Sequence, residues 1–156
     1  MAKNTIKLKK YLDVIDEFIA AGVITPGHLL EIDSAGKVVV HNSAGGNVTP
    51  LIALEDELQG RTIDDDFAAL EPVQVWGAQR GEVAYMLLAN GETAVIGNYL
   101  ESAGDGTLQV HSEDDASSDE PITIYGNQLV GIALEAVDMS GSSGADPSGR
   151  IKVRIV

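Results

Sequence analysis

Three histidines and several groups of acidic residues are the side chains of this sequence that could carry out chemistry. His28, His41 and His111 are scattered along the chain, with no His-x-x-x-His or related spacing. A metal site needs several ligands that converge on one point, so this spacing does not indicate metal binding. Two of the three lie beside predicted turns, where a solvated imidazole is the simpler interpretation.

Acidic residues cluster at residues 55–57, 64–66 and 113–115. A calcium loop spaces its oxygen ligands at alternate positions, with a glycine at the bend and a closing glutamate, and none of the clusters follows that pattern. Adjacent carboxylates on a strand point to opposite faces, so they do not converge without a turn. Solvated loops are therefore favoured over cation sites, and the many accidental carboxylate pairs do not specify a glycosidase.

Segments that resemble nucleophile, phosphate-binding or cofactor-carrier motifs lack the neighbouring helix or lysine that each motif requires. Ser140-Gly-Ser-Ser-Gly144 resembles a nucleophile elbow, but it lies in a loose segment with no predicted helix after it. Gly104-Asp-Gly106 lacks the helix that a phosphate loop requires. A biotin or lipoyl carrier needs a lysine at a hairpin tip, which the turn at Asn90-Gly91 does not supply. We expect no enzymatic activity, no cofactor and no metal.

Composition indicates one globular domain of a structural or binding kind. The chain has 156 residues, of which 44% are hydrophobic and only 4% aromatic, so its core must consist mainly of aliphatic side chains. There is no cysteine, which excludes disulfides and thiolate chemistry. No segment is apolar enough for a membrane span, and acids interrupt the stretch where a signal peptide would need an apolar run. A formal net charge of −14 argues against nucleic acid as a partner.

The N-terminal residues differ in charge from the rest of the chain. Residues 1–10 hold four of the ten basic residues and no acid. Apolar and cationic side chains alternate there, which is typical of an edge strand or of an arm that adds to a neighbouring sheet. We therefore predict a basic extended arm at residues 1–12 and a single β-rich domain at residues 13–156. A solvated terminus is the alternative. The arm residues predicted to bind are Lys3, Thr5, Ile6, Lys7, Leu8, Lys9, Lys10 and Tyr11.

Trp76 is the only tryptophan of the chain and lies in a predicted strand. A single tryptophan is usually a core residue, but its size also makes it a good anchor at an interface. The sequence favours a core position, and an oligomer interface stays open as the alternative.

Glycine-rich turns separate a series of short predicted strands. The turns are centred on residues 25–27, 33–36, 90–91 and 102–106, and those at 33–36 and 90–91 predict hairpins. Strict alternation at residues 150–156 predicts a half-buried strand. Residues 11–21 fit either a short helix or an extended segment, and residues 51–58 fit a strand end or a helical turn. The other predicted strands cover residues 29–32, 37–41, 73–77, 83–89, 94–96, 107–111, 122–125 and 129–138.

These features predict a mainly β fold, a small β-barrel or β-tulip-like domain with at most one or two short helices. Polar and small residues predict flexible loops at about residues 112–121 and 140–149. The sequence shows no convincing internal repeat.

Four segments together resemble tailed-phage head decoration proteins, which are also called capsid cement proteins. They are Thr25-Pro-Gly27, Gly97-Asn-Tyr-Leu-Glu-Ser-Ala-Gly-Asp-Gly106, Val130-Gly-Ile-Ala-Leu-Glu-Ala-Val-Asp138 and Arg150-Ile-Lys-Val-Arg-Ile155. The similarity extends from about Ile24 to the end of the chain. Its motifs are turns and strands and include no catalytic signature.

This resemblance implies a barrel-like fold related to the lambda-type decoration protein. It implies a homo-oligomer, usually a trimer and otherwise a dimer, on the outer surface of the phage head. There the protein would bridge subunits of the major capsid protein and stabilise the shell, and the basic arm would contact the capsid. Two alternatives stay open: a β-rich virion module of a tail, fibre or receptor-recognition type, and, less favoured, a hydrolase that uses paired carboxylates.

Overall fold

The computed structural model describes residues 15–113, 123, 125–142 and 149–156 of the chain. The predicted basic arm lies outside these residues, as do most of the two predicted flexible loops. The division into an arm and one domain therefore stays a prediction.

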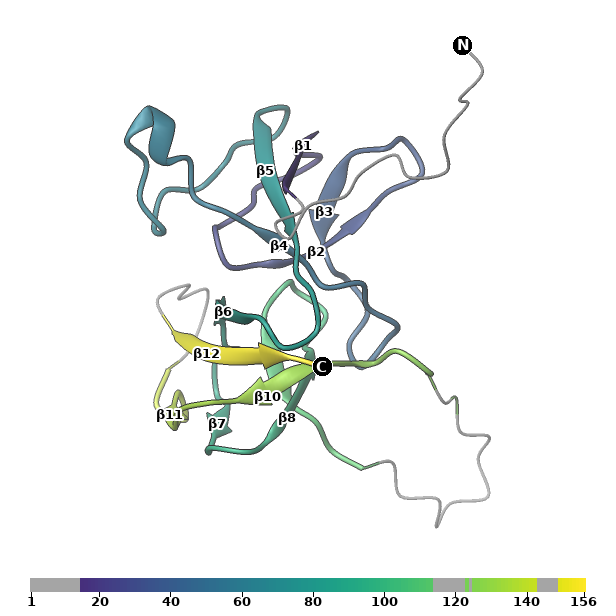
Figure 1. Cartoon of the computed structure of the whole chain (residues 1–156), viewed down its shortest axis with the longest axis vertical. Helices are drawn as coiled ribbons and strands as arrows, with labels where there is room; N and C mark the ends of the chain where they lie inside the picture. Colours follow the sequence, from purple (N-terminus) through teal and green to yellow (C-terminus); the bar gives the residue numbers. More distant parts are fainter. Residues whose placement is uncertain (1–14, 114–122, 124, 143–148) are drawn as a thin grey trace.

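Antiparallel strands dominate the described part of the chain and form two five-stranded sheets and one two-stranded sheet (Figure 1). The mainly β fold predicted from the sequence is confirmed. A single turn of 3-10 helix, η1, is the helix of the described residues. The first sheet has the order β1-β5-β4-β2-β3 and the second β6-β12-β10-β8-β9, while β11 pairs with β7. The strands are β1 (Ile15–Ile19), β2 (Leu29–Ile32), β3 (Val38–Val40), β4 (Leu51–Ala53), β5 (Pro72–Gly77), β6 (Val83–Leu87), β7 (Thr93–Ala94), β8 (Tyr99–Ser102), β9 (Leu108–Val110), β10 (Leu129–Ala133), β11 (Val137–Asp138) and β12 (Arg150–Ile155), and η1 is Glu57–Gln59.

Local turn chemistry explains the β2–β3 hairpin, which is confirmed. The Asp33 side chain accepts hydrogen bonds from the backbone N–H groups of Ala35 and Lys37, at 2.8 and 2.9 Å. Gly36 follows with φ 75°, a left-handed conformation that glycine adopts without a steric penalty. The ambiguous segments also resolve: residues 15–19 are extended, and residues 51–58 contain both β4 and η1.

The hairpin predicted around Asn90 and Gly91 is wrong. A turn is present and Gly91 has φ 85°, but the flanking strands do not pair with each other. Instead β6 pairs with β12, and β7 pairs with β11. The Asn-Gly dipeptide fixes only the local bend, whereas burial selects the strand partner: Met86 of β6 and Ile151 of β12 are opposite each other and fully buried.

The strand predicted near the C-terminus is confirmed as β12, which lies between β6 and β10. Its side chains alternate between the core and solvent over Ile151–Ile155, with Lys152 and Arg154 exposed. Arg150 departs from this pattern because its guanidinium is buried and hydrogen-bonded, as described below.

The two five-stranded sheets repeat one another, contrary to the expectation from the sequence that there is no internal repeat. The strand orders match one for one when β1 to β5 are equated with β6, β8, β9, β10 and β12 in chain order. Residues 52–55 and 132–135 both read Ile-Ala-Leu-Glu and take the same place in β4 and β10. We refer to residues 15–78 as the first unit and to the described residues of 83–156 as the second unit.

Pairing registers make the correspondence residue by residue. Leu30 pairs with Val40 as Leu100 pairs with Val110. Equivalent backbone hydrogen bonds recur as well, for example from Gly27 N to Ala53 O and from Gly97 N to Ala133 O, both at 2.9 Å. The remaining equivalences follow the same registers: Ile15 with Val83, Leu29 with Tyr99, Glu31 with Glu101, His41 with His111, Ile52 with Ile132, Trp76 with Arg154 and Ala78 with Val156.

Each five-stranded sheet curls until its edges meet at one corner without closing into a barrel. A single parallel bridge joins Ala20 to Val38 in the first unit and Leu88 to Leu108 in the second. The β7–β11 pair of the second unit corresponds to the isolated bridge between Ile24 and Phe67.

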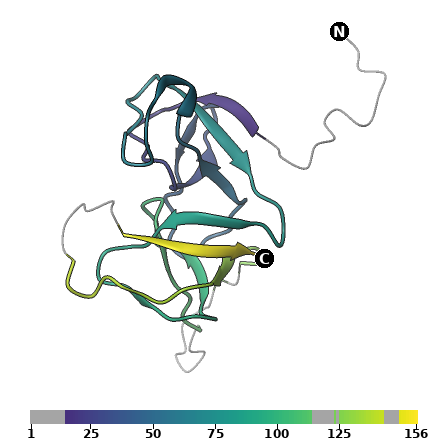
Figure 2. The same cartoon turned by 60° about the vertical axis from the view of Figure 1, so that its left-hand side comes forward.

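The units lie one above the other in both views (Figures 1 and 2). The first unit has its own core, which includes Leu30, Phe67 and Val75. The core of the second unit also includes four residues of the first: Leu29, Val48, Ile52 and Ala78. Buried apolar surface therefore joins the two units. No helix of the described residues is long and apolar enough to cross a membrane.

Candidate binding face on the second unit

A row of large side chains crosses the outer side of the second five-stranded sheet. Val83, Arg154, Ile132 and Tyr99 are direct neighbours in register on β6, β12, β10 and β8. Residues opposite each other in an antiparallel sheet point to the same side, so the four side chains share one surface. Tyr99 and Val83 are each 49% exposed. We call this surface the second-unit face.

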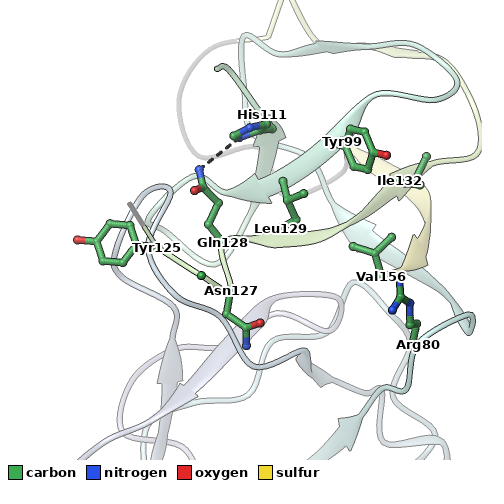
Figure 3. A pocket seen from close by; sticks show the side chains of 10 residues that line it. Arg80, Tyr99, His111, Tyr125, Asn127, Gln128, Leu129, Ile132 and Val156 are labelled. Carbon is green, nitrogen blue, oxygen red and sulfur yellow. Dashed lines mark hydrogen bonds between the residues drawn. The ribbon is translucent and has the colours of Figure 1, made fainter. Parts of the chain in front are cut away.

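A cleft of about 590 Å³ lies on this face (Figure 3). Tyr99 and Ile132 lie together at one side of it, Tyr125 at the other, and Leu129 between them. Exposed aromatic and aliphatic side chains rimmed by polar ones are typical of protein-binding surfaces. The lining also includes Arg80, His111, Asn127, Gln128 and Val156.

A buried carboxylate organises the polar end of the cleft. Glu101 is 4% exposed and accepts hydrogen bonds from Gln109 Nε2 at 2.9 Å and from Gln128 Nε2 at 3.0 Å. His111 Nδ1 lies 2.6 Å from the same carboxylate. Burial by itself would raise the pKa of Glu101, but the hydrogen bonds from Gln128, His111 and Gln109 lower the pKa below its ordinary value. Glu101 thereby holds Gln128 and His111 at the cleft.

The equivalent histidine of the first unit joins the two units. His41 is 2% exposed, and its Nε2 donates to the carbonyl oxygen of Asn47 at 2.9 Å. Its Nδ1 lies 2.7 Å from the Ser102 hydroxyl oxygen, within hydrogen-bond distance. Glu31 is 3.9 Å away, beyond hydrogen-bond distance. The prediction of a solvated imidazole is wrong for His41, because the packing of the units buries it.

His28 serves the turn that opens β2. Its Nδ1 accepts a hydrogen bond from Thr25 N at 3.0 Å. Burial lowers the pKa of His28, outweighing the opposite effects of Asp105 and Asp66. Within the described part of the chain, no group of three or more histidine or acidic side chains could hold a metal ion.

The acidic cluster at residues 64–66 has local partners rather than a cation site. Asp66 accepts from the Thr25 hydroxyl at 2.6 Å, and Asp65 accepts from the backbone N–H of Thr62 at 2.6 Å. Asp64 bonds to the guanidinium of Arg150 at 2.8 Å. The same guanidinium donates to the carbonyl oxygens of Pro26 and Ile63, so Arg150 ties the second unit to the first.

Three of the six lysine and arginine side chains of the described residues have an acidic partner. Arg61 pairs with Glu71, Arg150 with Asp64 and Lys152 with Glu135. Lys37, Arg80 and Arg154 form no ion pair with any other described residue, and the two arginines border the second-unit face. On a chain of net charge −14, this face therefore presents unpaired positive charge.

The structure tests few of the site residues that the sequence suggested. Lys3, Thr5, Ile6, Lys7, Leu8, Lys9, Lys10 and Tyr11 all lie outside the described residues. Trp76 lies in β5, is partly buried and packs against the core that the two units share. Its role at an oligomer interface stays a prediction.

Sequence reasoning missed the second-unit face. The alternation of β12 indicated that Lys152 and Arg154 point outward, but it did not indicate that Tyr99 and Ile132 lie beside them. One signal was available: Glu31 precedes His41 by the same interval as Glu101 precedes His111, and this interval marks equivalent hairpins.

The geometry defines a tandem β protein with a candidate binding face on its second unit. No family model and no curated protein matches the chain. Among solved structures, the fold is similar to the head fiber gp8.5 N base of bacteriophage phi29. The TM-score is 0.55 at 14% sequence identity, and the match covers 93% of this chain and 95% of that chain. At this identity the comparison establishes the shared fold.

Proposed function

We propose that this protein is a structural component of a tailed-phage head, bound to the outer surface of the capsid. In this proposal it bridges subunits of the major capsid protein and stabilises the shell without catalysis, cofactor or metal. It acts as a homo-oligomer, a trimer or a dimer, in the virion. Contact with neither nucleic acid nor a membrane is required.

The fold similarity to a phage head protein carries this proposal, since it extends over nearly the whole of both chains. The motifs at residues 25–27, 97–106, 130–138 and 150–155 point to the same class of protein independently. A shell-stabilising protein needs many weak contacts repeated by symmetry, and multivalency makes such contacts strong together. The acidic composition suits a protein that is crowded on a surface, because like charges limit non-specific adhesion.

The basic arm supplies the first capsid contact in this proposal. Its lysines favour an acidic surface, and its alternating apolar residues favour addition to a sheet edge. The electrostatic part of this contact weakens as salt concentration rises.

A second candidate is the base of a fibre or receptor-binding module on the virion, with no role in stabilising the shell. The observation that favours it is that the solved neighbour is itself the base of a head fiber. Quantitative mass spectrometry of purified virions separates the two candidates. A copy number comparable with that of the major capsid protein fits shell stabilisation, and a much lower number fits a fibre base or a tail part.

Capsid binding tests the proposal directly. Heads of the encoding phage that lack this protein are incubated with the purified full chain and sedimented. We expect the full chain to co-sediment and the chain without residues 1–11 to stay folded and bind much less. A full chain that never co-sediments would contradict the proposal, whereas unchanged binding by the truncated chain would contradict only the role of the arm.

A further inference from the structure

The contact between the two units buries one face of the first unit. Leu29, Ile52 and Ala78 are 0%, 3% and 8% exposed and belong to the core of the second unit. Trp76 packs against the same core. A turn of the second unit also docks here through its main chain: Gly106 O accepts from Leu29 N at 2.8 Å, and Gly106 N donates to His41 O at 3.0 Å.

The second unit carries the same face with nothing from the described chain covering it. Tyr99, Ile132 and Val156 are the equivalents of Leu29, Ile52 and Ala78, and Tyr99 and Val156 are 49% and 37% exposed. The main-chain groups are open too. Among the described residues, Tyr99 N has no acceptor and His111 O has no donor, although their equivalents in the first unit are both bonded to Gly106.

The first unit has its own copy of the turn that docks in this contact, and no described residue covers that copy. The turn equivalent to Ser102–Gly106 is residues 32–36, which ends in Gly36 at φ 75°. Ile32 on this turn is 49% exposed, and no atom apart from those of Gly36 and its two chain neighbours lies within 4 Å of where a Cβ of Gly36 would be. At Gly106, by contrast, a Cβ would lie only 2.9 Å from Val40 Cβ and 3.0 Å from His28 Cδ2, because that turn is already docked.

We propose that the second-unit face binds the first unit of a second copy of this chain, through a contact equivalent to the one within each chain. The turn at residues 32–36 of one copy then lies against Tyr99 and His111 of the next. Gly36 supplies the carbonyl oxygen to Tyr99 N. Its N–H, which donates to Asp33 O at 3.0 Å within the turn, exchanges that acceptor for His111 O. Ile32 and Ile132 become buried in the new contact.

The residues that differ between the two faces fit a contact that forms between separate chains. Tyr99 stands where the first unit has Leu29, and Arg154 stands where it has Trp76. Tyrosine and arginine tolerate water before association and are enriched at protein interfaces. A permanently covered face has no such requirement and is built from leucine, isoleucine and tryptophan.

Such a contact joins two different surfaces, so it is heterologous and leads to a ring or to an open chain of copies. This inference specifies the oligomer assumed in the proposed function, but the purified chain tests it without any capsid. A chain that assembles and fails to bind heads would contradict the proposed function and leave this inference intact.

The test measures the molar mass of the full chain by light scattering during gel filtration, up to about 100 μM, a range that includes weak contacts. We expect wild-type protein to exceed the mass of one chain. Ile132→Glu places a charge on the receiving face, and Ile32→Glu places one on the docking turn. Each variant alone should elute with the mass of one chain. An equimolar mixture should contain a dimer, because each variant keeps the half that the other lacks.

Leu58→Glu is the matched control, since Leu58 is 90% exposed in η1 and belongs to neither half. It should assemble like wild type. Circular dichroism and urea unfolding verify that each variant is folded, and Tyr99→Asp replaces Ile132→Glu if the latter is not. A wild-type chain that is monomeric throughout the range, assembly that survives both substitutions, or a mixture without dimer would each overturn the inference.

Discussion

Leu29 and Tyr99 occupy the same position in the two units, yet Leu29 is completely buried and Tyr99 is half exposed. The difference does not arise from the strands, because both residues pair with the isoleucine of an Ile-Ala-Leu-Glu segment. It arises because the second unit covers the outer face of the first, while no described residue covers the outer face of the second. The duplicated fold therefore leaves two surfaces uncovered by the described residues. They are the second-unit face and the turn at residues 32–36 of the first unit.

Alanine substitutions at the equivalent residues Gly36 and Gly106 should lower stability by different amounts, because only the turn of Gly106 is docked. Gly36 and Gly106 have φ angles of 75° and 83°, but only Gly106 has neighbours close to the position of a Cβ. We expect Gly36→Ala to lower the free energy of unfolding by about 1 kcal/mol, from the left-handed conformation alone. Gly106→Ala should cost a further 1–3 kcal/mol or so, because Val40 must move. Urea unfolding at low protein concentration measures both, and equal losses would show that the turn is not tightly docked.

Arg150 should contribute strongly to stability. Its side chain is 4% exposed and bonds to Asp64 and to the carbonyl oxygens of Pro26 and Ile63. Removing it leaves both carbonyls without a donor, so we expect Arg150→Ala to lower the free energy of unfolding by about 2–3 kcal/mol. Chemical denaturation measures the loss.

Asp64→Asn is the control for this substitution. The Asp64 side chain is 72% exposed, so losing its charge should cost less than about 1 kcal/mol. Equal effects of Arg150→Ala and Asp64→Asn would mean that the ion pair, and not the buried carbonyl contacts, supplies the stability.

Glu101 and Glu31 are equivalent glutamates with different surroundings, which makes them a matched pair. Glu101 accepts hydrogen bonds from Gln109 and Gln128 and contacts His111, whereas Glu31 lies 3.9 Å from His41. We expect Glu101→Ala to destabilise the protein by about 2–3 kcal/mol, since it leaves buried donors unpaired. Glu31→Ala should cost less than about 1 kcal/mol. Thermal and urea unfolding compare the two variants, and similar losses would contradict the organising role of Glu101.

Local signals in the sequence were sufficient for the β2–β3 hairpin and for β12. Asp33 and Gly36 determine their turn through contacts within a few residues. The alternation of apolar and charged residues in β12 indicates which of its side chains are buried. The partner of β6 could not be read in this way, because pairing depends on residues far along the chain. The second-unit face was missed for a related reason: the strand pattern around Tyr99 does not show which unit covers which.

The internal repeat escaped detection because the two units do not recur at a fixed period. Residues 41–50 connect β3 to β4 in the first unit, whereas residues 111–128 connect β9 to β10 in the second. The longer connection shifts every later position, so a comparison at constant spacing aligns either the Glu-to-His hairpins or the Ile-Ala-Leu-Glu segments. Backbone registers are independent of loop length and reveal the repeat directly.

Acid sensitivity between about pH 7 and pH 5 should depend on His28. Burial lowers the pKa of His28, so the unfolded chain binds a proton more readily than the folded chain does. Stability is therefore complete above the unfolded pKa, near 6.5, and decreases as pH falls below it, by up to about 1.4 kcal/mol per pH unit. The second unit suggests the matched variant: at the equivalent position, Asn98 Oδ1 accepts from Val95 N at 2.8 Å, as His28 Nδ1 accepts from Thr25 N.

We expect His28→Asn to keep this hydrogen bond and to reduce the loss of stability between pH 7 and pH 5. The further loss at lower pH should remain in both proteins, because it belongs to carboxylates such as Glu71. Hydrogen bonds from Arg61 lower the pKa of Glu71 to about 2, so its contribution is present above its ordinary pKa and lost as pH falls toward 2. Urea unfolding at a series of pH values measures both windows. An unchanged slope between pH 7 and pH 5 in His28→Asn would show that another group is responsible for the acid sensitivity.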